Sequence, residues 1–100
     1  MFKKYVIYLG LNDKNTKKQE ITTPAAVEKV ARYMRDCTIT ECTGFYTHDD
    51  GTIITENTLK VEKIDFDGDF NMERAAADLK KMFNQEAIAV EIMTVNSKLM

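Results

Sequence analysis

The sequence predicts a single α+β domain in which two helices lie on one face of a four-stranded antiparallel sheet. Four runs are rich in β-branched and aromatic residues, as strands are: 4–11, 38–47, 52–66 and 87–95. Two other segments, 24–36 and 72–83, carry apolar residues at the three- and four-residue spacing of an amphipathic helix. The resulting order, β-α-β-β-α-β, favours the ferredoxin-like plait, because two short helices cover only one side of such a sheet.

Length and composition bound the domain organisation. The chain has 100 residues, of which 44% are hydrophobic and 30% charged, which predicts one ordered domain spanning residues 1–100. The start, Met1 to Lys4, leads directly into a strand-like run rather than a signal peptide. No run approaches the roughly 20 apolar residues that cross a bilayer. We therefore expect no membrane association and a cytoplasmic location.

Charge and metal-ligand content disfavour several functions. The net charge is −2 and the Lys and Arg residues are scattered, which argues against nucleic-acid binding. With one His, and with four residues between Cys37 and Cys42, the chain lacks a zinc pattern, and we expect two reduced thiols rather than a disulfide. The acidic segment 65–69 fails as a calcium loop, because Lys63 and Arg74 would occupy ligand positions. No metal or cofactor is predicted.

The first strand and helix have clear local signals. Gly10, near the end of the strand, indicates a bulge or a close approach of backbone. Thr23 is predicted to cap the first helix, with Pro24 at the first helical position.

The second half begins with a hairpin. The residues 48–51 end in Asp-Gly, which favours a tight turn between strands. In the following run Val61 and Ile64 have opposite parity, so we expect a bulge or break near Glu62 and Lys63. Asn71 is predicted to cap the second helix and Asn84 to stop it in a left-handed conformation.

The loop before the first helix is a candidate anion site. Its lysines and the hydroxyls at the helix start could hold a phosphate or carboxylate at the free backbone amides. The candidate residues are Lys17, Lys18, Thr22 and Thr23. A solvated loop followed by an ordinary helix cap explains the same residues.

A second set of residues is a candidate for an interface or the mouth of a pocket. Its members are exposed aromatic side chains, polar residues at turns and one strand carboxylate: Tyr8, Tyr46, His48, Glu56, Gln85 and Glu86. Glu56 and Glu62 share a strand and a parity, so they could lie on one face, as alternating Glu on an exposed strand also does. No nucleophile–base pair is recognisable, and no catalytic residue is assigned.

Three stretches, YLGLNDKNTKKQE, GFYTHDDGTIITENTLKVEKIDF and LKKMFNQEAI, carry a family resemblance. With their G-x-x-x-x-x-x-G hairpin, E-x-T strand and F-x-Q-E junction, they resemble a group of small phage and prophage proteins without an assigned activity. The order of features is also similar to a bacterial family of unknown function. The resemblance implies a phage or mobile-element context and offers no catalytic positions.

The predicted function is a small non-enzymatic binding protein of phage or mobile-element type. It would engage a protein partner, or form a dimer, through the open face of the sheet. Two alternatives remain: a protein that sequesters a nucleotide or another small anion, and an enzyme with an unrecognised carboxylate or His site.

Overall fold

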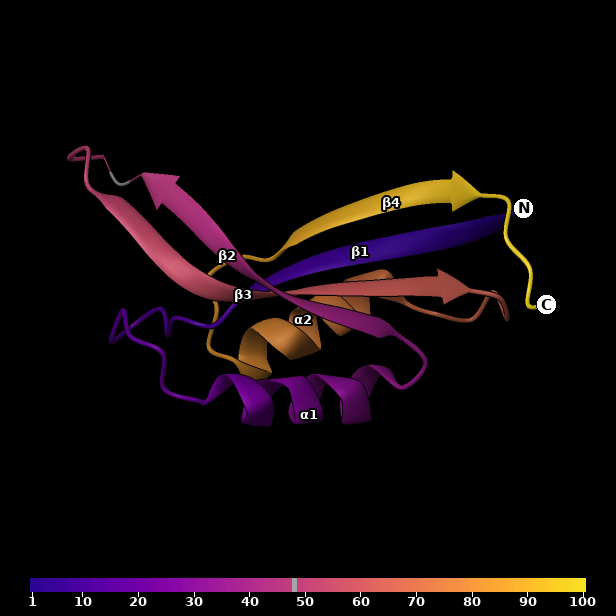
Figure 1. Ribbon diagram of the computed structural model, residues 1–100, viewed down its shortest axis with the longest axis horizontal. Helices are drawn as coiled ribbons and strands as arrows, with labels where there is room; N and C mark the ends of the chain where they lie inside the picture. Colours follow the sequence, from indigo (N-terminus) through magenta and orange to yellow (C-terminus); the bar gives the residue numbers. More distant parts are fainter. Residues whose placement is uncertain (48) are drawn as a thin grey trace.

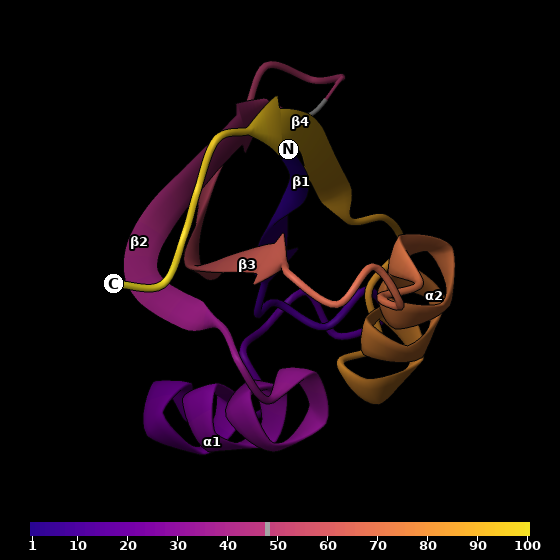
Figure 2. The ribbon, with the colours of Figure 1, turned by 90° about the vertical axis from the view of Figure 1, so that its right-hand side faces the viewer.

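The fold is the predicted ferredoxin-like α+β arrangement. The computed structural model describes residues 1–47 and 49–100 (Figure 1). Six elements follow one another: β1 (Phe2–Gly10), α1 (Thr23–Met34), β2 (Thr38–Thr47), β3 (Ile53–Asp65), α2 (Met72–Met82) and β4 (Ala89–Val95). The strands form one antiparallel sheet in the order β2-β3-β1-β4, and Figure 2 shows both helices on the same side of that curved sheet.

The hydrophobic core lies between the helices and the sheet. Ile7 pairs with Val61 and Leu9 with Leu59 in neighbouring strands, so all four side chains point to the helix face, where each is fully buried. The helices meet them with Val30 of α1 and buried apolar residues of α2. Because each fully buried side chain of this size contributes about 1.5–3 kcal/mol, this layer fixes the register of the central strands.

Side-chain caps begin both helices. The oxygen of Thr22 accepts a hydrogen bond from the amide of Ala25, so the cap of α1 is Thr22, one residue earlier than predicted. Asn71 caps α2, as predicted, through the amide of Arg74. Asn84 follows α2 with a φ of 48°, the predicted left-handed stop. In the described part of the chain, no helix has both the length and the apolar character to cross a membrane.

The break predicted within β3 is wrong, because the strand pairs with β1 and β2 in one continuous register. The two apolar sets that suggested a break face opposite sides of the sheet. Val61 faces the core, whereas Ile64 pairs with Lys4 on the other face, and Phe66 beyond it packs edge-on against Phe2 at a ring-centroid distance of 5.0 Å.

The middle of the sheet's open face is polar rather than apolar. The ammonium group of Lys4 lies 3.1 Å from the carboxylate of Glu62, and the hydroxyl of Tyr8 donates to Glu91 over 2.5 Å. These pairs flank Val6, which is only 3% exposed. The middle of this face therefore offers little of the apolar surface on which the predicted self-association depended. Apolar side chains gather instead at the end that carries Phe2, Ile64 and Phe66.

The hairpin formed by β2 and β3 projects past the end of β1. Pairing between β1 and β3 stops at Gly10 and Thr58, whereas β2 and β3 stay paired to Thr47 and Ile53. Figure 1 shows this projecting part, residues 44–47 and 53–57, as an arm extending from the body. Its base forms a corner with the loops that follow β1 and α2, and the candidate site lies there.

Candidate functional site

The pocket at this corner has a volume of about 320 Å³, near the lower end of the roughly 300–1,000 Å³ of typical ligand sites. We call it the corner pocket. Three segments line it: the loop after β1 with Asn12, Asp13, Lys14 and Lys17, the hairpin arm with Tyr46 and Glu56, and the connection from α2 to β4 with Gln85, Glu86 and Ala87. Residues far apart in sequence therefore converge on one hollow.

Glu56 is held in the pocket by a glycine and a backbone amide. Gly10 ends β1 on the same face of the sheet, and a β-carbon there would lie 2.4 Å from Oε1 of Glu56. The predicted close approach at Gly10 is thus real, although a carboxylate rather than backbone makes it. Oε2 of Glu56 accepts a hydrogen bond of 3.0 Å from the amide of Asn12.

Gln85 ties the two loops of the pocket together. The side chain is buried, and its Nε2 donates to the carbonyl oxygens of Asn12, at 2.7 Å, and Phe83, at 3.2 Å. Asn12 therefore links Glu56 and Gln85, since its amide donates to one and its carbonyl accepts from the other. This chain of contacts fixes a carboxylate and a buried amide at one place.

Asp13 organises the loop that carries the lysines. Its carboxylate accepts hydrogen bonds from the side chain of Asn84 and from the amides of Asn15 and Thr16. These contacts, the first above all, lower the pKa of the Asp13 carboxyl below its ordinary value. Asp13 is therefore occupied within the loop, which leaves Glu56 and Glu86 as the carboxylates available to a ligand.

The structure gathers five of the predicted site residues at the corner pocket. Lys17, Tyr46, Glu56, Gln85 and Glu86 all line it. Of these, Gln85 is buried and Glu56 is half-buried, whereas Lys17, Tyr46 and Glu86 are exposed.

The other predicted residues lie elsewhere. Lys18 is exposed outside the lining, while Thr22 caps α1 and Thr23 accepts a hydrogen bond from Gln19. Tyr8 is engaged with Glu91 on the open face. His48 lies outside the described residues.

The carboxylates that share a parity on β3 do not form a pair. Six residues of extended strand separate Glu56 from Glu62 by roughly 20 Å, and Glu62 is engaged with Lys4. Glu56 and Glu62 therefore do not form a catalytic pair of carboxylates, although they share a strand and a face.

Asn12 is a pocket residue that the sequence did not indicate. It acts through its backbone amide and carbonyl, which every residue except proline provides, so its side-chain type carries no signal. Lys14 belongs to the loop with the predicted lysines, but only the folded loop shows that it lines the pocket while Lys18 does not.

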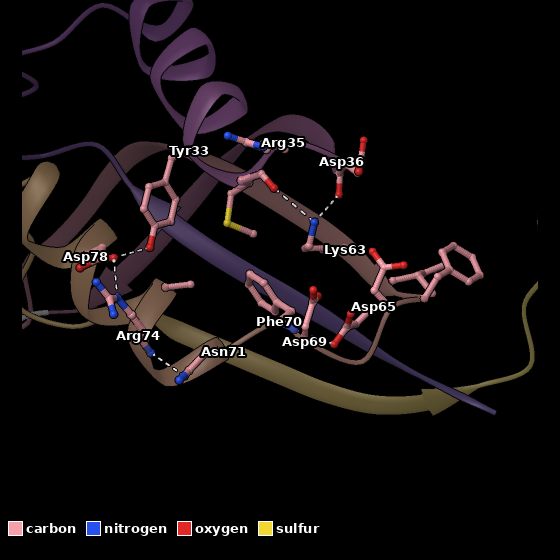
Figure 3. A pocket seen from close by; sticks show the side chains of 15 residues that line it. Tyr33, Arg35, Asp36, Lys63, Asp65, Asp69, Phe70, Asn71, Arg74 and Asp78 are labelled. Carbon is pink, nitrogen blue, oxygen red and sulfur yellow. Dashed lines mark hydrogen bonds and ion pairs between the residues drawn. The ribbon is translucent and has the colours of Figure 1, made fainter.

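A larger hollow of about 640 Å³ lies at the other end of the sheet, between the end of α1, the end of β3 and the start of α2 (Figure 3). Tyr33 of α1 donates to Asp78 of α2 across it, and burial together with this bond raises the pKa of Tyr33 to about 12. Lys63 donates to the carbonyl oxygens of Met34 and Asp36 at the end of α1.

Several polar groups of this second hollow serve the fold. The carboxylate of Asp65 accepts from the amides of Gly68 and Phe70, and so shapes the turn before α2. Since these side chains already bond to the backbone or to each other, the corner pocket is the better candidate for a ligand site. Among residues 1–47 and 49–100, no group of three or more His, Cys, Asp or Glu side chains could hold a metal ion.

Two solved structures are similar to this chain. A phage SAM lyase in complex with S-methyl-5'-thioadenosine has a TM-score of 0.69 and 24% sequence identity, over 92% of this chain and 80% of that one. A phage SAM lyase in the apo state has a TM-score of 0.63 and 25% identity, over 91% and 78% of the two chains. No family model and no curated protein matches the chain.

The likeness bears out a relation to phage proteins and corrects the predicted function. A non-enzymatic binding protein was expected, but the structures that share nearly the whole fold belong to an enzyme, one of them with a small nucleoside ligand. The predictions of partner binding through the open face and of no enzymatic activity are overturned by this finding. The alternatives of a nucleotide-like ligand and of an enzyme agree with it better.

Proposed function

We propose that this protein binds S-adenosylmethionine in the corner pocket and cleaves it to S-methyl-5'-thioadenosine. The observation that carries the proposal is the similarity, over 92% of the chain, to a phage SAM lyase in complex with that thioadenosine. The corner pocket supports it independently, because it joins a positioned carboxylate, an aromatic ring and two ammonium groups.

Charge complementarity favours this substrate. At neutral pH S-adenosylmethionine carries two positive charges, on the sulfonium and the α-ammonium, and one negative charge on its carboxylate. The carboxylates of Glu56 and Glu86 attract a ligand with a net positive charge, and Lys14 and Lys17 are available for its carboxylate. A ligand with several phosphates would face the two glutamates unfavourably.

Tyr46 supplies a surface for the nucleoside. Its side chain is 41% exposed on the arm and lines the pocket. Aromatic side chains stack on nucleobases whatever the base, because every base has a π-face. In the proposed complex the adenine lies against Tyr46, and the amino-acid end extends toward Glu56 and the lysines.

The reaction breaks the bond between the sulfonium sulfur and the γ-carbon of the methionine part. The electron pair of that bond stays on sulfur, which becomes the neutral thioether of S-methyl-5'-thioadenosine. Since the positive charge on sulfur decreases in the transition state, a carboxylate beside the sulfur would stabilise the ground state more than the transition state. Glu56 therefore serves better at the α-ammonium group, where the charge persists.

The identity of the second product distinguishes two routes by which the bond to the γ-carbon can break. If the substrate carboxylate attacks that carbon, its oxygen forms the new bond, and a lactone appears without proton transfer. If a base removes a β-proton, that electron pair forms a double bond and an unsaturated amino acid appears. Both routes balance without any further reactant.

The test is to incubate the purified protein with S-adenosylmethionine and to measure S-methyl-5'-thioadenosine and the second product by chromatography and mass spectrometry. We expect steady release above the rate of spontaneous breakdown, and a loss of that release in Glu56→Gln. Binding is measured separately by thermal shift, because a ligand at 100 times its Kd stabilises by about 2.7 kcal/mol. Binding without turnover would indicate a sequestering protein. The absence of both binding and turnover would overturn the proposal.

A further inference from the structure

We propose that Lys14 and Lys17 form the subsite for the substrate's carboxylate, so that the pocket selects a nucleoside bearing a complete amino acid. This inference rests on the proposed function and deepens it. It concerns specificity: a ligand with the carboxylate should bind far better than an analogue without it.

The loop that carries these lysines is held rigidly. The amide of Asp13 donates to the carbonyl of Lys18 over 2.8 Å, and the amide of Lys17 donates to the carbonyl of Asp13 over 2.8 Å. The amide of Lys14 donates over 3.0 Å to the carbonyl of Asn84, just beyond α2. The backbone beneath both lysines is thus fixed to itself and to the neighbouring segment.

The backbone at Lys17 has an uncommon conformation. Its φ is 64°, in the left-handed region that residues with a β-carbon seldom adopt. Such conformations concentrate at functional sites, where the surrounding structure holds them in place. Here the bond from the amide of Lys17 to Asp13 holds it, and the residue lines the pocket.

Both ammonium groups are available to a ligand. In the part of the chain that the structure describes, the ion pairs involve Lys4, Arg32 and Arg74, and neither Lys14 nor Lys17 forms one. The nearest acidic residue in sequence, Asp13, is bonded to Asn84 and to backbone amides, and the charge of Lys14 is the smallest of the causes that lower the pKa of its carboxyl. Two cations from the loop after β1, neither of them in an ion pair with a described residue, line the same pocket as Glu56 of β3, and together these charges can orient a zwitterion.

The test compares ligands that differ at the carboxylate. S-adenosylhomocysteine carries an α-ammonium and a carboxylate and is not a sulfonium, so it remains intact during calorimetry. Its decarboxylated analogue lacks only the carboxylate, and S-methyl-5'-thioadenosine lacks the whole amino-acid end. For the natural sequence we expect S-adenosylhomocysteine to bind about tenfold or more tightly than its decarboxylated analogue.

The variants assign that preference to the two lysines. Lys14→Gln with Lys17→Asn removes both charges, and Asn tolerates the left-handed backbone at residue 17. We expect this variant to lose the preference and to keep its affinity for S-methyl-5'-thioadenosine. Lys14→Arg with Lys17→Arg should restore the preference, and Lys18→Gln, which changes a neighbouring lysine outside the pocket, should leave it intact.

The outcomes separate this inference from the proposed function. If S-methyl-5'-thioadenosine binds but the natural sequence shows no preference for the carboxylate, the lysine subsite is wrong and the proposed function stands. The same conclusion follows if the charge-removing variant weakens all three ligands equally, since that is a structural effect. If no nucleoside binds, both proposals fall.

Discussion

The carboxylate of Glu56 occupies the space that a side chain at residue 10 would fill. A β-carbon on Gly10 would lie 2.4 Å from one carboxylate oxygen of Glu56 and 2.7 Å from the other. Real β-carbon contacts do not come so close, so glycine at the end of β1 is what lets the carboxylate fold back toward Asn12. The position of the main acidic group of the pocket thus depends on a residue without a side chain.

Gly10→Ala should therefore reduce activity while sparing the fold. The clash falls on the flexible end of Glu56, which can swing away, and Gly10 does not have a positive φ. We expect the free energy of unfolding to change by no more than about 1 kcal/mol. Displacing a positioned group by about 1 Å can lower the rate up to about 100-fold. Urea unfolding and the rate of S-methyl-5'-thioadenosine release measure the two quantities.

A double-mutant cycle checks that the loss passes through Glu56. Gly10→Ala should lower activity much less in the Glu56→Gln background than in the natural sequence, because the side chain that it displaces has already lost its charge. Independent, additive losses would show that Gly10 acts in another way.

Glu56→Gln tests the charge itself. The amide oxygen of Gln can still accept the hydrogen bond from Asn12, so the geometry is preserved. A hydrogen bond to a charged group contributes about 1.5–3 kcal/mol, so affinity for S-adenosylhomocysteine should fall at least about tenfold. S-methyl-5'-thioadenosine has no ammonium group, and its affinity should remain. Calorimetry measures the affinity of the variant for both ligands. Equal losses of affinity for the two would place Glu56 at the nucleoside rather than at the ammonium group.

The fold could be predicted from the sequence because its determinants are local and periodic. Ile7 and Leu9 alternate along β1, Thr22 and Pro24 mark the start of α1, and Asn84 stops the chain after α2, each by short-range chemistry. The one-residue error at the α1 cap arose because Thr22 and Thr23 are chemically equivalent candidates. In the structure the hydroxyl of Thr22 caps the helix, whereas that of Thr23 accepts a hydrogen bond from Gln19.

The site could be predicted only as separate residues. Tyr46, Glu56 and Gln85 stand out by type and by position at turns or strand ends, yet their convergence depends on the arm passing β1 and on two loops meeting there. The contacts that join them use the backbone of Asn12 and the missing side chain of Gly10. The backbone of Asn12 leaves no pattern in the sequence, and Gly10 indicates a close approach without indicating that the carboxylate of Glu56 makes it.

Gln85→Ala should weaken both the fold and the pocket. The substitution leaves the half-buried carbonyl of Asn12 and the buried carbonyl of Phe83 without this donor, at a cost of about 1–3 kcal/mol in the free energy of unfolding. Ligand affinity should fall as well, because Gln85 fixes the loop that carries Lys14. Glu86→Ala, at the exposed neighbouring residue, should change the unfolding free energy by less than about 0.5 kcal/mol. A similar loss of stability in both variants would contradict this account.

Tyr46→Ala should weaken nucleoside binding. Loss of base stacking on an aromatic side chain costs about 1–3 kcal/mol, so affinity for S-methyl-5'-thioadenosine should fall about tenfold. Phe45→Ala is the matched control, because Phe45 is a neighbouring aromatic residue on the arm, 70% exposed, and does not line the pocket. If calorimetry shows equal effects for both variants, the arm contributes through general apolar surface rather than through Tyr46.

Tyr33 should make stability depend on pH in the alkaline range. Burial and the hydrogen bond to Asp78 raise the pKa of Tyr33 to about 12, whereas the unfolded chain has the ordinary value of 10.0. Between these values unfolding releases the phenolic proton, so rising pH favours the unfolded chain. The stabilisation is complete below pH 10 and is lost as the pH rises toward 12.

Tyr33→Phe isolates this effect, because every other titrating group is common to both proteins. Below pH 10 the natural sequence should be more stable by about 1 kcal/mol, the usual contribution of such a hydrogen bond. That advantage should shrink in urea unfolding experiments from pH 10 to pH 12, as the unfolded tyrosine ionises first. Activity at neutral pH should be unchanged, since Tyr33 lines the larger hollow (Figure 3) and does not line the corner pocket. A stability advantage that stays constant from pH 10 to pH 12 would show that the hydrogen bond between Tyr33 and Asp78 does not raise the pKa of Tyr33. A loss of activity at neutral pH would instead place the reaction in the larger hollow.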